Sequence, residues 1–107
     1  MVLLQVEATM EEAVELGDVL DACGALVERT LVAFASGHEV GPHLTEIHRL
    51  ENEGDRISRA GLAALFAGGI DPMVVIRWKD LYDSLEDAID ACEAVAIQIE
   101  GILLAQG

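Results

Sequence analysis

The chain has 107 residues, enough for a single domain with one modest core and too few for two domains. Hydrophobic residues make up 52% of it and aromatic residues only 4%, a composition that favours helices over a β-sandwich or barrel. Twenty acidic and six basic residues give a formal net charge of −14, which excludes nucleic acid and anionic bilayer surfaces as simple electrostatic partners and favours a cation.

The cysteines and the start of the chain carry little signal. Cys23 and Cys92 stand far apart, without a CxxC motif or a Cys/His cluster, so we expect small core residues rather than a zinc site or a disulfide. The first residues do not follow a signal-peptide pattern, and no apolar run is long enough to cross a bilayer. We therefore expect a cytoplasmic protein.

Apolar residues at helical spacing predict a first helix over residues 2–36. Gly17 and Gly24 lie inside it, and each weakens a helix interior by up to about 1 kcal/mol relative to alanine. We expect them to mark either a kink or a place where another helix packs closely. In the loop that follows, Gly37 suits a left-handed C-terminal cap and Pro42 suits the first turn of the next helix.

The second helix is expected over residues 42–67 and the third over residues 72–105. Gly68 and Gly69 end the second helix, and Asp71 followed by Pro72 is an N-cap with proline at the first helical position. Helices joined by short loops pack as antiparallel neighbours. The sequence thus predicts an all-α, up-down-up three-helix bundle that forms one domain.

Two carboxylates stand out in the second helix. Glu51 and Asp55 are four residues apart, so they share one face, and that face lies within the apolar stripe of the helix. Carboxylates in such a place are unfavourable unless a cation, a proton or hydrogen-bond donors compensate them. Arg56 and Arg59 are the nearest candidates for pairing with Glu51.

The third helix carries a stripe of acids on the side opposite its apolar seam, with further acids at the flank. The stripe comprises Asp80, Asp83, Asp87 and Asp90, and the flanking acids are Glu86 and Glu93. Like charges at this spacing repel by a few tenths of a kcal/mol per pair, so local stability does not explain the stripe. A plain solvated face is the alternative.

The turn between the second and third helices suggests which acids meet. If it closes an antiparallel pair, residues at the same height have numbers that sum to about 139, and Glu51 is level with Ala88. Carboxylates that converge from two helices suit Mg²⁺, Ca²⁺, Mn²⁺ or iron, with zinc less specific. The sequence therefore predicts a metal site with the candidate ligands Glu51, Asp55, Glu86, Asp90, Asp83 and Asp87.

Beyond Glu93 the acidic side of the third helix becomes apolar. The residues that continue it are Ala94, Ile97, Gly101 and Leu104. With a mean hydropathy of +0.38, the chain has more apolar surface than one small bundle buries. We therefore expect these last turns to contact another subunit or domain, in a homodimer or a higher homo-oligomer.

Of the three histidines, one is a candidate ligand. His38 and His43 flank the first loop, where we expect solvent exposure, whereas His48 lies on the same flank of its helix as Asp55. His48 is therefore an accessory candidate for the metal site.

Three stretches resemble one family: Glu46 to Asp55, Leu65-Phe66 ahead of Asp71-Pro72, and Leu85 to Glu93. They are similar to PhoU-like proteins, in particular to the phosphate-transport regulators associated with Pit-type transporters. The paired E(D)xxxD motifs carry the resemblance, which covers the second and third helices well and the first only by periodicity.

The resemblance implies a three-helix PhoU repeat whose E(D)xxxD carboxylates hold metal. By motif position, Glu51 and Asp55 match the ligands of the second helix, and Glu86 and Asp90 match those of the third. It also implies a non-enzymatic regulator of phosphate uptake that acts with a membrane transporter or its signalling partner at the inner face of the membrane. Family members usually carry two such repeats, so this chain is either a half-length form that dimerises into six helices or a fragment.

Two other functions are consistent with parts of the sequence. A magnesium-dependent, all-α nucleotide pyrophosphohydrolase needs an ExxE motif and a later ExxD, and only the first is present, from Glu12 to Glu15. The other alternative is a helical dimerisation module whose acids are merely solvated.

Overall fold

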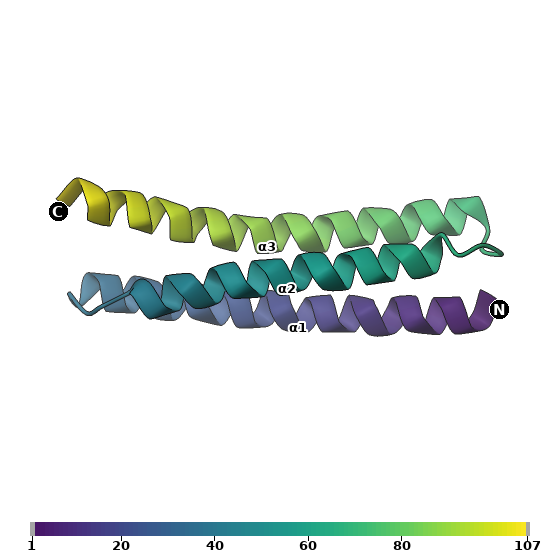
Figure 1. Ribbon diagram of the computed structural model, residues 1–107, viewed down its shortest axis with the longest axis horizontal. Coiled ribbons are helices and arrows are strands. Elements are labelled where there is room, and N and C mark those ends of the chain that lie inside the picture. Colours follow the sequence, from purple (N-terminus) through teal and green to yellow (C-terminus); the bar gives the residue numbers. More distant parts are fainter. Residues whose placement is uncertain (1, 107) are drawn as a thin grey trace.

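The protein is a rod of three helices. The computed structural model describes residues 2–106, with side chains from residue 7 onward. Its helices are α1 (Val2–Ala35), α2 (Gly41–Leu65) and α3 (Pro72–Gln106), which run up, down and up along a rod of 55 × 18 × 15 Å (Figure 1). The expected all-α three-helix bundle is confirmed, and residues 2–106 contain no strand.

The two turns use the residues that the sequence singled out. Gly37 after α1 has a φ of 73°, and Gly68 and Gly69 after α2 have φ values of 104° and 85°, a region that side chains disfavour. At the start of α3 the backbone N–H of Met73 donates to Oδ1 of Asp71 at 2.8 Å, so the predicted N-cap is confirmed.

The core lies along the axis of the rod, with Leu16 and Cys23 from α1, Ile47 from α2 and Tyr82 from α3 almost fully buried. The hydroxyl of Tyr82 donates to the backbone carbonyl of Thr9 at 2.6 Å, which ties α3 to α1. Both cysteines are free thiols packed in or against this core, as expected.

Two buried glycines bring α2 close to α3. A Cβ built on Gly54 would lie 3.1 Å from Cδ1 of Ile89, and a Cβ on Gly61 would overlap the ring of Tyr82. The numbers of these contacting residues sum to 143, so the predicted sum of 139 is wrong by four residues, about one helical turn. The reason is the loop, because the chain continues past the end of α2 before it reverses, and α3 overhangs α2 there (Figure 1).

The two glycines of α1 behave differently. The helix continues through Gly17 and Gly24 without a break, and a Cβ on either would meet no atom within 4 Å. No described helix of this chain packs closely against them, so the close packing expected at these glycines is not made within the bundle.

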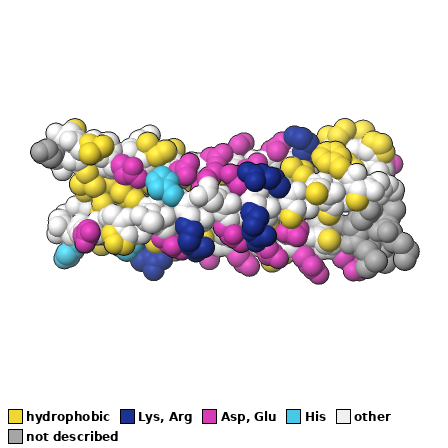
Figure 2. All heavy atoms as spheres, viewed as in Figure 1, with side chains coloured by type: hydrophobic (Ala, Val, Ile, Leu, Met, Phe, Trp, Pro, Cys, Tyr) yellow, Lys and Arg dark blue, Asp and Glu magenta, His cyan; other side chains and the backbone are white. Residues whose placement is uncertain are grey.

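Charge and apolar surface are unevenly distributed along the rod. Acidic side chains gather around its middle, whereas hydrophobic side chains gather towards both ends, including the end that carries the α2–α3 loop (Figure 2). The exposed apolar residues at that end include Phe66, Met73 and Ile76. No helix in the described part of the chain is both long and apolar enough to cross a membrane.

Candidate metal centre

Four carboxylates meet where α2 faces α3, near the middle of the rod. They are Glu51 and Asp55 from α2 and Asp90 and Glu93 from α3, and we call them the acidic seam. The side chains of Glu51, Asp55 and Glu93 are half-buried, and that of Asp90 is exposed. The helices hold these groups together because α2 and α3 are packed closely at Gly54, between Glu51 and Asp55.

The seam disfavours its own negative charge. Burial raises the pKa of Glu51 to about 7, and the nearby carboxylates of Asp55, Glu93 and Asp90 contribute in the same direction. The pKa of Asp90 is also raised, first by burial and then by its acidic neighbours. None of the described arginine or lysine side chains lowers the pKa of either residue. A proton or an external cation would relieve this repulsion.

Two of the three arginines of α2 pair with glutamates outside the seam. Arg49 donates to Glu46 and Arg56 donates to Glu53, each within its own helix at an exposed site. Arg56, one of the two candidates for pairing with Glu51, therefore pairs with Glu53 instead. The i,i+3 spacing explains why, because Glu53 lies on the same face as Arg56 and Glu51 does not.

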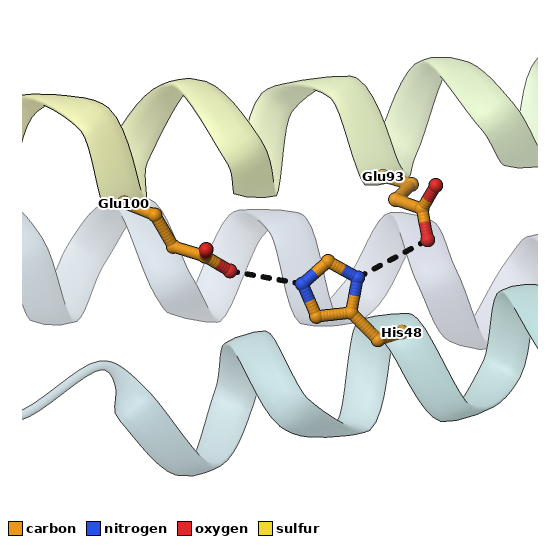
Figure 3. A network of polar contacts seen from close by, with 3 residues as sticks. All are labelled: His48, Glu93 and Glu100. Carbon is orange, nitrogen blue, oxygen red and sulfur yellow. Dashed lines mark hydrogen bonds and ion pairs between the residues drawn. The ribbon is translucent and has the colours of Figure 1, made fainter.

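Among the described residues of α2, His48 is the basic side chain that hydrogen-bonds to α3. Its Nδ1 lies 3.1 Å from Oε2 of Glu93 and its Nε2 lies 2.9 Å from Oε1 of Glu100 (Figure 3). A neutral imidazole has a single N–H, so both nitrogens donate only in the protonated ring. Hydrogen bonds to Glu100 and Glu93 accordingly raise the pKa of His48. Of the other histidines, His38 is exposed as expected, but His43 is half-buried.

The one-turn change of register rearranges the predicted ligands. The structure brings Glu51 and Asp55 together with Asp90, and it adds Glu93. The other three predicted ligands lie further along or around α3. Glu86 is half-buried. Asp87 is exposed, and its negative charge helps to raise the pKa of Asp90. Asp83 accepts a 2.8 Å hydrogen bond from Lys79.

Glu93 and Glu100 were not among the predicted site residues, although the sequence contains a signal for them. Glu86, Glu93 and Glu100 recur every seven residues, which in a bundle keeps all three on one flank of a helix. In the structure this is the flank of α3 that faces His48.

The seam offers the oxygen ligands that a cation prefers, but these oxygens are not already arranged around a common point. Carboxylate oxygens are the ligands that hard and borderline metal ions prefer. In the part of the chain that the structure describes, no three histidine, cysteine, aspartate or glutamate side chains surround one point that could hold a metal ion. Metal binding here therefore requires the carboxylates to rotate towards a common centre.

Comparison with known proteins gives two relatives. The chain is 32% identical over 79 residues to the UPF0111 protein YkaA of Bacillus subtilis (strain 168), an alignment that covers 74% of this chain and 38% of YkaA. It is also 32% identical over 72 residues to the "Putative pit accessory protein" of Rhizobium meliloti (strain 1021), covering 65% of this chain and 34% of that protein.

These alignments span only a little over a third of each relative. No protein-family model and no solved structure matches the chain. Neither relative is named as an enzyme, and one is named as an accessory protein of pit.

Proposed function

We propose that this chain is an accessory protein of phosphate transport that belongs with the PhoU-like regulators of Pit-type transporters. The observation that carries the proposal is the similarity to the pit accessory protein, which covers 65% of the chain. The E(D)xxxD motifs at Glu51 and Asp55 and at Glu86 and Asp90 support it, because three of these four residues, all but Glu86, belong to the acidic seam. The proposal assigns no catalytic residue.

The proposed ligand of the seam is a metal ion. Glu51, Asp55 and Asp90 would supply its first oxygens, and Glu86, Asp83 and Asp87 lie further along or around the same helix for additional ions. Iron, zinc, Mn²⁺, Mg²⁺ and Ca²⁺ are all candidates, with the all-oxygen donor set favouring the harder ions. A bound cation would remove the repulsion across the seam and hold α2 and α3 together.

The proposed partner is a phosphate transporter, or a signalling partner of that transporter, at the cytoplasmic side of the membrane. The last turns of α3 offer an apolar contact surface, since Ile97 is 54% and Leu104 is 82% exposed and Ala94 and Gly101 lie beside them. Such a strip on an otherwise acidic rod marks a protein-contact surface. We propose that the protein also self-associates.

Titration with Mn²⁺, followed by calorimetry, tests the metal site. The wild-type protein is expected to bind Mn²⁺, and Glu51→Gln with Asp90→Asn should weaken binding at least about tenfold, because two charged oxygen donors are lost. Asp18→Asn with Asp21→Asn is the matched control, since it removes two acids of α1 and leaves the seam intact. Equal weakening in both double variants would show that Mn²⁺ responds only to the net charge.

A second pair of variants tests the register. Glu93→Gln should weaken Mn²⁺ binding more than Glu86→Gln, since Glu93 acts directly on Glu51 in the structure. The reverse order would favour the pairing predicted from the sequence.

Deletion of the coding sequence in its own host tests the transport role. The initial rate of radiolabelled phosphate uptake should change, and the wild-type gene should restore it whereas Glu51→Gln with Asp90→Asn should not. Unchanged uptake at both scarce and abundant phosphate would contradict the proposed function.

A further inference from the structure

The end of the rod that carries the α2–α3 loop is apolar and exposed (Figure 2). Phe66 is 63%, Met73 60% and Ile76 52% exposed, and a hollow of about 350 Å³ beside them is lined by uncharged residues alone. We call residues 65–76 the apolar tip. Its single charged residue is Asp71, whose carboxylate accepts a hydrogen bond at the start of α3, where a helix favours negative charge. The tip is therefore an apolar surface that the bundle leaves exposed.

Basic rather than acidic residues adjoin the apolar tip. Residues 56–79 contain four of the six basic residues of the chain and one of its 20 acids. Arg77 follows the tip on α3, and Arg59 precedes it on α2. In the described part of the chain Arg77 pairs with no carboxylate, unlike its neighbour Lys79, which donates to Asp83. Although the protein has a net charge of −14, the guanidinium next to its apolar end is available to an anion outside the chain.

Along α3 the chemistry of the side chains changes in three zones. The first residues of the helix, 72–76, are all apolar. Arg77 and Trp78 come next, about 8–9 Å from Pro72 at the 1.5 Å rise of a helix. The acids begin with Asp80, at about 12 Å, and continue to the middle of the rod. Distance from the tip thus orders the side chains of α3 from apolar, through basic and aromatic, to acidic.

The other two helices also keep their acids away from this end. Counted from Phe66, which follows α2, Arg59 lies about 10 Å away and the nearest acid of that helix, Asp55, about 16 Å away. Helix α1 begins at the same end of the rod (Figure 1), and its first acid, Glu7, lies about 7–8 Å from that start. The zones therefore lie across the rod, as layers perpendicular to its axis, and not along one of its sides.

We propose that the apolar tip inserts into the surface layer of a lipid bilayer, so that the rod stands end-on on the membrane. The observation that selects a bilayer is the order of the zones, because apolar side chains, then arginine and tryptophan, then acids match hydrocarbon, headgroups and water. A partner helix would need an apolar stripe along the rod, whereas these zones lie across it. Insertion by about 5–10 Å is typical of interfacial helices, and it would bury Phe66, Met73 and Ile76 while Asp80 stays in water.

Arg77 and Trp78 suit the headgroup layer. With Val74 and Leu81 they line a hollow of about 300 Å³. The guanidinium can donate to a lipid phosphate, and tryptophan is enriched where the apolar and polar layers of a membrane meet. Glu7 limits the depth, because insertion beyond about 8 Å would bring its carboxylate into the apolar layer. The insertion is therefore shallow.

The net charge of the chain permits this orientation. Most acidic side chains gather around the middle of the rod (Figure 2), which is 55 Å long, so its centre lies about 27 Å from the tip, more than three Debye lengths at physiological salt. Apolar burial, and not attraction between opposite charges, then drives binding, and anionic lipid opposes it. The last turns of α3 lie at the other end of the rod (Figure 1), where they stay accessible to a protein partner.

Fluorescence of Trp78, the single tryptophan of the chain, tests the proposal on the purified full chain. Titration with phosphatidylcholine vesicles should shift its emission to shorter wavelength, and lipids brominated on their acyl chains should quench it. Phe66→Gln with Met73→Gln should weaken binding at least about tenfold, because two apolar side chains of the tip are lost. The matched control is Val14→Gln with Val32→Gln, at positions of α1 that are 65% and 62% exposed and lie outside the tip. It should bind like the wild type, and circular dichroism should show unchanged helicity in both variants.

Single arginine variants and lipid charge test the orientation. Arg77→Gln should weaken binding about threefold, whereas Arg29→Gln, which removes the same charge near the other end of α1, should not. Replacing part of the phosphatidylcholine with phosphatidylglycerol should weaken binding at low salt, and added salt should restore it. Unchanged Trp78 emission with phosphatidylcholine vesicles would overturn the proposal and assign the tip to a protein partner. Equal weakening within either pair of variants, or tighter binding to anionic vesicles at low salt, would also overturn it.

Discussion

The two flanks of α3 have the same seven-residue spacing and opposite chemistry. One flank presents Glu86, Glu93 and Glu100 towards α2, and the other presents an uncharged row that begins at Val74 and ends at Ile102. In the described bundle His48 hydrogen-bonds to Glu93 and Glu100 of the acidic flank, whereas Val74, Leu81 and Ile102 of the uncharged flank remain 41% to 45% exposed. Both flanks are incomplete in the single chain, but one lacks cations and the other lacks apolar contacts.

The glycines show the same contrast between closed and open packing. Gly54 and Gly61 are buried between α2 and α3, where a side chain would press on Ile89 or Tyr82. Gly17 and Gly24 lie in the interior of α1, and a Cβ on either would meet no atom within 4 Å. A glycine in a helix lowers its stability, so both pairs need a packing reason. The first pair has that reason inside the chain, whereas no described residue packs at the Cβ positions of the second pair.

The largest expected effect comes from filling a closed position. Gly61→Ala would place a methyl group against the buried ring of Tyr82, and overpacking of this kind destabilises a protein by about 1–3 kcal/mol. Urea unfolding followed by circular dichroism should show a lower midpoint with an unchanged slope. An unchanged midpoint would mean that α2 and α3 separate there at little cost, and that their packing is looser than the structure shows.

The next effect concerns the acidic seam and its pH dependence. Folding raises the pKa of Glu51 from 4.5 to about 7, so the folded protein holds a proton that the unfolded chain releases. Stability without metal should therefore fall as pH rises from about 4.5 to 7. Glu51→Gln should lessen that fall and raise the melting temperature at pH 8 by a few degrees, because it removes a charge from a repulsive cluster.

Melting curves of the metal-free protein at several pH values make this measurement. Asp21→Asn is the control, because Asp21 is exposed on α1 and its substitution changes the net charge equally. A lower melting temperature for Glu51→Gln at pH 8 would show that donors within the protein stabilise the carboxylate.

The sequence predicted the helices well because their signals are local. The Asp71-Pro72 cap and the positive φ at Gly37 depend on neighbouring residues alone, and both were predicted. The register between α2 and α3 was missed by one turn, since it depends on how far the loop travels and on where Gly54 and Gly61 admit Ile89 and Tyr82. The predicted register assumed that the chain reverses at the centre of the Gly68 to Asp71 turn. The structure differs, because α3 begins beyond the end of α2.

The candidate site was predicted in part for the same reason. The pairing of Glu51 with Asp55 follows from helical spacing, so the sequence identified it. The approach of Glu93 depends on the register, and the bridge from His48 to Glu100 depends on two side chains that are 52 residues apart. The seven-residue spacing of the glutamates was visible, but only the structure shows that their flank faces α2.

A smaller effect of opposite sign is expected at the open glycines. Gly24→Ala should stabilise the monomer by about 0.5–1 kcal/mol, because alanine favours the helix and its methyl group meets no atom. Urea unfolding at a concentration where the protein is monomeric measures this gain. Gly61→Ala is the reference. If Gly24→Ala raises the free energy of unfolding and Gly61→Ala lowers it, the open and closed glycines are distinguished. Destabilisation by Gly24→Ala would indicate an unrecognised contact at this exposed position of α1.

The smallest effect is expected at His48, which contacts Glu93 and Glu100 on the acidic flank of α3. Its hydrogen bonds to Glu100 and Glu93 raise the pKa of the imidazole above 6.5, so their contribution is present below pH 6.5 and is lost as pH rises through the raised value. His48→Gln should therefore lower the free energy of unfolding by about 0.5 kcal/mol at pH 6 and by much less at pH 9, as partly exposed ion pairs are weak. His38→Gln, at an exposed site, is the control for losing a titratable ring. Equal losses at both pH values would assign the contact to neutral hydrogen bonding, and His48 would then not act as a cation towards Glu93 and Glu100.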